Sequence, residues 1–91
     1  MKTMYNQIIT KLIEMDYIYF VNGEELIDAV NLIVNVYCLA EVIDEKFGKE
    51  VFKKMISSAV RNLNHVLIGS FDHDNKEKTF NEWFNETYMT Q

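Results

Sequence analysis

Apolar residues recur at helical spacing along most of the chain, and the longest such run is ELIDAVNLIVNVYCLAEVIDEKFG, Glu25 to Gly48. Asn22 precedes Glu25 by three residues, the spacing of a capping box, so a helix is predicted to start there. Gly48 follows Lys46 closely and predicts the end of this helix, with the lysine near the negative end of the helix dipole. The alternative is a continuous helix that tolerates Gly48 at a cost of about 1 kcal/mol.

Three other segments show the same periodicity. Residues 3–15 read as an amphipathic helix, residues 52–67 form one apolar stripe that ends before Gly69, and Thr79 with Glu82 repeats the capping spacing ahead of an aromatic segment that runs to Tyr88. The intervening SFDHDN reads as a polar turn. Residues 16–21, DYIYFV, are either a last helical turn or an extended connector that places Tyr17, Ile18, Tyr19 and Phe20 against the helices.

Proline is absent and only three glycines occur, which favours long helices joined by short turns. The sequence therefore predicts an all-α fold: residues 1–91 form a single domain, a small antiparallel bundle of three to four helices with a long central second helix. A chain of 91 residues builds one core and buries about 60 to 65 per cent of its unfolded surface, so association with another chain would add to a thin stability margin.

The second helix has one apolar side from end to end and another side that changes character. That other side carries Glu24, Asp28, Asn31 and Asn35 in its first half, and it continues as Cys38, Leu39 and Val42. One interpretation is that the first or last helix covers this second half. The other is that an exposed apolar patch, with Ile27 and Val34 nearby, pairs with a second copy or another protein. The aromatic end, with Trp83 and Phe84, either closes the bundle or anchors an interface.

Charge and cysteine content narrow the class of partner. The net charge is −5, whereas phosphate binding needs clustered Lys and Arg, so nucleic acid is a disfavoured partner and a protein surface a favoured one. Cys38 is the only cysteine, so no intramolecular disulfide can form, and a cytoplasmic location is expected. The run from Leu26 to Ala40 is too short and too often interrupted to span a bilayer.

No spacing in the sequence is typical of a catalytic, cofactor or metal site. Cys38 and His65 have no recognisable third partner for nucleophilic catalysis, and His65 and His73 lack zinc-site spacing. Asp72 and Asp74 are spaced like the first ligands of a calcium loop, but the glycine and the bidentate glutamate of that loop are missing. We therefore predict no enzyme, no cofactor and no bound metal.

The hypothesis that follows is a small acidic protein-interaction module that masks or scaffolds another protein. Homodimerisation is compatible with it, and small inhibitors used by phages and mobile elements against host machinery have a similar size and character. The interface residues predicted from the sequence are Ile27, Val34, Cys38, Leu39, Val42, Trp83 and Phe84. The alternative hypothesis is a helical DNA-binding regulator that uses the third helix and the basic residues at its start, from Lys46 to Arg61.

Overall fold

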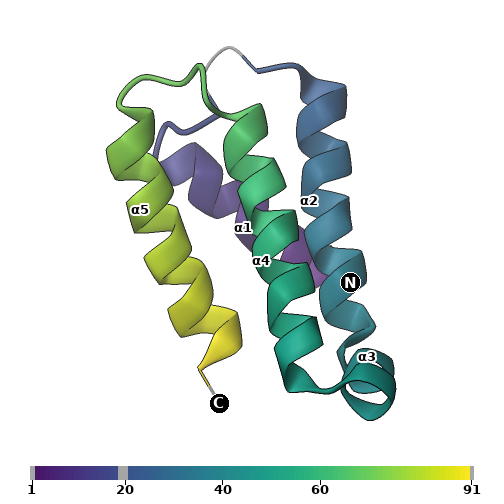
Figure 1. Ribbon diagram of the computed structural model, residues 1–91. Helices are drawn as coiled ribbons and strands as arrows, with labels where there is room; N and C mark the ends of the chain where they lie inside the picture. The colour runs from purple at the N-terminus through teal and green to yellow at the C-terminus, as the bar shows by residue number, and fades with distance from the viewer. Residues whose placement is uncertain (1, 19–20, 91) are drawn as a thin grey trace.

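A computed structural model describes residues 2–18 and 21–90, and the predicted all-α fold is confirmed for them, since they contain no strand (Figure 1). Five α-helices follow one another along the chain: α1 (Lys2–Glu14), α2 (Gly23–Cys38), α3 (Ala40–Phe47), α4 (Lys49–Val66) and α5 (His73–Phe84). A π-helical turn, η1 (Asn85–Met89), extends α5. The predicted count of three to four helices is too low, because the long central helix is divided in two.

That division lies at Leu39. Leu39 has φ −91° and ψ 8°, and the axes of α2 and α3 differ by 57°. No glycine or proline marks the break. The bend instead coincides with the point where the polar residues of the predicted helix change sides. Before the bend they lie on the side that ends with Asn35, and after it they lie on the side of Glu41 and Glu45. Each half thus presents a different face to the rest of the protein.

The predicted start and end of this region are both observed. The Asn22 side chain accepts hydrogen bonds from the backbone N–H groups of Glu24, at 2.9 Å, and Glu25, at 3.3 Å. Gly48 separates α3 from α4 with φ 85° and ψ 165°, a conformation that is essentially restricted to glycine. The chain then reverses, and α4 packs along α2.

The core lies where α1 crosses behind the layer formed by α2, α4 and α5 (Figure 1). Met4, Ile8 and Leu12 recur every four residues on α1 and are buried, as the amphipathic pattern predicts. The α4 stripe is also buried, apart from Val66, which is half-buried, and Met55, which is 41% exposed. The connector after α1 adds the fully buried Tyr17, whereas Tyr19 and Phe20 lie outside the described residues.

The last helix begins seven residues earlier than the Thr79 cap predicts, because its N-cap is Asp72. Asp72 precedes α5 in the left-handed conformation, with φ 55°, so SFDHDN contains the start of a helix as well as a turn. Aspartate adopts this conformation more readily than most residues. Phe80 and Phe84 are buried on the inner side of α5.

Candidate protein-interaction surface

Large apolar side chains are exposed in and around α3, the short helix that departs from the direction of α2 and lies beside the start of α4 (Figure 1). Leu39 is 52% exposed, Val42 49% and Phe47 62%, and Val51 at the start of α4 is 37% exposed. Cys38, the last residue of α2, is exposed beside them. We call these five residues, Cys38, Leu39, Val42, Phe47 and Val51, the elbow patch. They are all within residues 38–51, whereas the other exposed large apolar side chains, including Phe71 at 78% and Ile68 at 60%, are distributed over other parts of the described chain.

The shortness of α3 explains this exposure. A helix of eight residues packs one side against α4 and buries Ile43, which is 5% exposed. Its other sides have no helix over them, and the 57° bend turns them away from α1 and α5. Phe47, which the sequence pattern assigns to the core side, is therefore more exposed than Leu39 or Val42.

Charged residues of both signs border the elbow patch. Glu41 and Glu45 are exposed on α3, and Lys46 and Lys49 are exposed at its end. Asp44 is half-buried between them, and its Oδ1 atom is buried without a hydrogen-bond partner among the described residues. The patch is thus accompanied by exposed charges of both signs.

The remaining residues of the predicted interface are in other places. Ile27 is 45% exposed on the first half of α2, away from the elbow. Val34 and Phe84 are 4% and 2% exposed and belong to the core, so they are not part of an open surface. Trp83 is half-buried and packs against Phe80 and Tyr88. The structure therefore brings Cys38, Leu39 and Val42 together and separates them from the other four.

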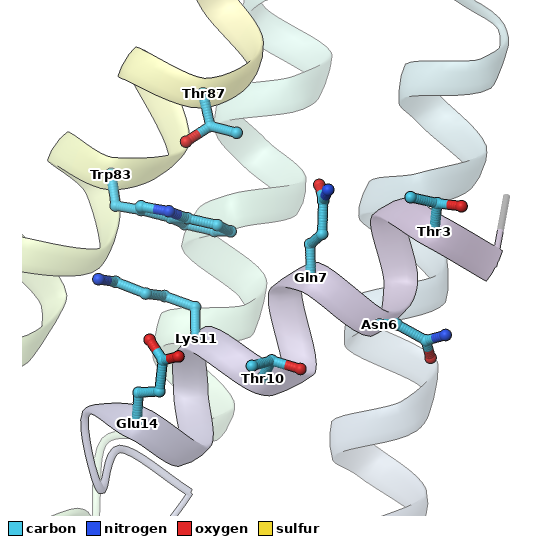
Figure 2. A pocket seen from close by; sticks show the side chains of 8 residues that line it. All are labelled: Thr3, Asn6, Gln7, Thr10, Lys11, Glu14, Trp83 and Thr87. Atoms are coloured by element: carbon cyan, nitrogen blue, oxygen red, sulfur yellow. The ribbon is translucent and has the colours of Figure 1, made fainter.

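Trp83 faces a polar groove between α1 and α5 (Figure 2). The Lys11 ammonium lies 5.8 Å from the centroid of the indole, within the range of a cation–π contact. The groove has a volume of about 540 Å³, and its other lining residues are Thr3, Asn6, Gln7, Thr10, Glu14 and Thr87. Its walls are mainly neutral hydrogen-bonding groups, unlike the apolar elbow patch.

A buried polar network joins the connector after α1 to α4 and α5. The Tyr17 hydroxyl donates to Asn64 Oδ1 at 2.8 Å and lies 3.1 Å from His73 Nδ1. Asn64 Nδ2 in turn donates to Asn81 Oδ1 at 2.8 Å. Burial, with the nearby carboxylates of Glu77 and Asp74 as smaller causes, raises the pKa of the Tyr17 hydroxyl far above its ordinary value. The network therefore holds Tyr17 in its neutral, hydrogen-bonded form.

The groups considered for catalysis and metal binding are also placed. Cys38 ends α2, whereas His65 lies near the far end of α4, which runs back along α2, so the fold separates them (Figure 1). His73 has Asp74 and Glu77 close by, with ligand atoms within 4.8 Å of one another. The His73 Nε2 atom lies 3.1 Å from Glu77 Oε2, a contact between residues one helical turn apart. This pairing accounts for the closeness of the His73 and Glu77 side chains.

No family model matches this chain, and neither a curated protein nor a solved structure is detectably similar to it. Among the described residues no single helix is long and apolar enough to cross a membrane, and α2 and α3 meet that test only as a bent pair.

Sequence reasoning missed two features of the structure. Phe47 falls on the continuous apolar side of the predicted second helix and was assigned to the core, and Val51 was not singled out, but both are exposed. The Tyr17 network joins residues that are 47 and 56 positions apart, so no local spacing could have indicated it.

Proposed function

We propose that this protein is an interaction module that binds another protein chain through the elbow patch and thereby masks or scaffolds it. The observation that carries the proposal is the exposure of Leu39, Val42 and Phe47 at one end of the molecule, each by about half or more. Exposed apolar side chains that gather in one region commonly mark protein interfaces.

The free energy available from covering the patch is substantial. Complete burial of a Leu, Val or Phe side chain stabilises by about 1.5–3 kcal/mol, so covering a side chain that is already half-buried adds about 1 kcal/mol. Leu39, Val42 and Phe47 together then supply about 3 kcal/mol, which is about a hundredfold in affinity. This is a useful share of the binding energy, though not all of it, because association also costs translational and side-chain entropy.

A second copy of the chain is the occupant that the charges favour. Exposed residues of both signs, Glu41, Glu45, Lys46 and Lys49, lie among the residues of the patch in sequence. In a twofold interface the same patch meets itself in reverse, so acidic residues of each copy could pair with basic residues of the other. Such pairing would relieve the like-charge repulsion that a net charge of −5 imposes on two copies.

The test is the mass in solution, measured by light scattering over a range of concentrations for the wild type and for Val42→Glu. We expect a dimer for the wild type and a folded monomer for the variant, because the substitution places a charge in the apolar contact. The matched control is Ile68→Glu. Ile68 is 60% exposed and lies just beyond the opposite end of α4, so this variant should remain a dimer.

Circular dichroism and thermal unfolding establish that both variants are folded. A substitution of a half-exposed residue should change the stability by no more than about 0.5 kcal/mol. A wild type that stays monomeric up to about 1 mM would exclude the second copy as the occupant. The proposal would then require another protein that binds the wild type and Ile68→Glu but does not bind Val42→Glu. Failure of both tests would refute the proposed function.

A further inference from the structure

A second groove runs between α4 and α5, on a different part of the molecule from the elbow patch. Its volume is about 380 Å³. The floor consists of Ile56 and Val60 from α4, Phe84 from α5 and Met89 from η1. The rim is polar and contains Lys53, Ser57, Arg61, Asn64, Glu77, Asn81 and Asn85. An apolar floor with a polar rim and a volume above about 300 Å³ is typical of binding grooves.

The α4 wall of the groove is basic. Lys53, Ser57 and Arg61 follow one another every four residues and share one face of the helix. Lys54 adds a further positive charge in a hollow beside this face, which Lys53, Ser57 and Arg61 also line together with one acidic residue, Glu50. Lys53 Nζ is 4.0 Å from Glu50 Oε1, and the two side chains are 62% and 86% exposed, so this ion pair is weak and easily exchanged. The wall thus favours an acidic ligand.

The α5 wall offers side-chain amides at a regular spacing. Asn81 of α5 and Asn85, the first residue of η1, are four residues apart, which is about 6 Å along an α-helix. Alternate residues of an extended chain are about 6.6 Å apart, so the two amides match the peptide groups of alternate residues. An asparagine side chain both donates and accepts, and can therefore pair with a backbone C=O and N–H. Asn81 uses its Oδ1 to accept from Asn64, which leaves its Nδ2 group to donate to a backbone carbonyl.

We propose that this groove binds an extended acidic segment of a partner protein. Lys53 and Arg61 are eight residues apart, about 12 Å along the helix, and residues i and i+4 of an extended chain are about 13 Å apart. The segment therefore carries acidic residues at its first and fifth positions, and apolar residues at its second and fourth positions point towards the floor. Binding of this segment is independent of the elbow patch, so it adds a second partner class to the proposed function.

The test uses fluorescence polarisation with a labelled peptide whose centre is Glu-Leu-Ser-Leu-Glu, and a matched peptide with lysine in place of both glutamates. We expect the acidic peptide to bind at least about tenfold more tightly than the lysine peptide, and more weakly as salt rises. Arg61→Glu should weaken binding about tenfold or more, because a like charge replaces an attractive one. Asn85→Ala should weaken it about fivefold, the effect of one lost hydrogen bond.

Two control variants separate this proposal from general charge effects and from the elbow patch. Lys46→Glu makes the same charge change as Arg61→Glu, but on α3, outside the groove. It should change the peptide affinity by no more than about twofold. Val42→Glu should also leave the peptide affinity unchanged. Peptide binding in the groove can therefore be refuted while binding through the elbow patch stands, and binding through the elbow patch can be refuted while peptide binding stands. Equal affinity for the two peptides, an equal loss in Lys46→Glu and Arg61→Glu, or no effect of Asn85→Ala would overturn the proposal. Tighter binding of random duplex DNA than of the acidic peptide, abolished by Arg61→Glu, would overturn it in favour of a nucleic-acid surface.

Discussion

Removal of one oxygen atom from the buried network should destabilise the protein by a predictable amount. Tyr17→Phe keeps the ring, which is fully buried against Phe80, and removes only the hydroxyl. Asn64 is 2% exposed and loses the donor to its Oδ1 atom, and His73 Nδ1 loses its partner at 3.1 Å. A buried polar atom left unpaired costs about 1–3 kcal/mol, so we expect a loss of about 2 kcal/mol in the free energy of unfolding.

The assay is urea and thermal unfolding followed by circular dichroism. For a domain of about 60–100 residues, 1 kcal/mol lowers the midpoint temperature by about 4–8 °C, so Tyr17→Phe should melt about 8–16 °C below the wild type. Tyr5→Phe is the matched control, because its hydroxyl is not part of this network and its loss should shift the midpoint by only a few degrees. A double-mutant cycle of Tyr17→Phe with Asn64→Ala should give a coupling energy above about 0.5 kcal/mol. A loss below about 0.5 kcal/mol in Tyr17→Phe, or an equal loss in Tyr5→Phe, would refute the assigned role of the hydrogen bonds.

Three further predictions concern pH and backbone conformation. Because the pKa of Tyr17 is higher in the folded chain than in the unfolded one, its contribution to stability is complete below pH of about 10 and is lost as the pH rises above that value, by up to about 1.4 kcal/mol per unit. When the free energy of unfolding is measured at increasing alkaline pH, it should decline less steeply for Tyr17→Phe than for the wild type. The variant keeps only the smaller effect of Tyr88, because burial and the nearby Tyr37 also raise the pKa of Tyr88. An identical decline would contradict the assignment. Gly48→Ala should cost about 2 kcal/mol in urea unfolding because of its positive φ, whereas Gly69→Ala, with open space around its Cα, should cost little. Asn22→Ala should cost about 1 kcal/mol through loss of the cap, and an unchanged urea midpoint would contradict that role.

Local signals in the sequence were sufficient for much of the fold. The Asn22 cap, the break at Gly48 and the buried stripe of α4 all depend on residues within a few positions of one another, and each is observed. The bend at Leu39 has no such signal, because no helix-breaking residue is present. The sequence feature that accompanies the bend is the shift of the polar residues to another side of the helix after Asn35. One interpretation of this shift was that different helices pack against the two halves of a straight helix. The start of α5 was missed because the polar residues SFDHDN were interpreted as a turn. Asp72 in this segment does adopt a left-handed conformation, but the helix begins directly after it.

The candidate surface was predictable only in part. The sequence analysis selected Cys38, Leu39 and Val42 because their side of the predicted helix is polar in the first half and apolar in the second. This property can be seen from the sequence alone. Whether the protein's own helices cover that side depends on the direction of α3, which the bend determines. Phe47 is part of the patch for the same reason. The grooves between α1 and α5 and between α4 and α5 arise from the distances between helices, which no local pattern encodes.

Chemical labelling of Cys38 tests the elbow patch most directly. Cys38 is the only cysteine in the chain and is exposed within the patch, so a thiol-reactive dye reports on this surface alone. If a second copy covers the patch, the labelling rate per molecule should fall several-fold as the protein concentration rises through the association range, and Val42→Glu should react at the fast rate throughout. A rate that is the same from the lowest concentration to about 1 mM, in the wild type as in Val42→Glu, would contradict the proposed self-association of the elbow patch.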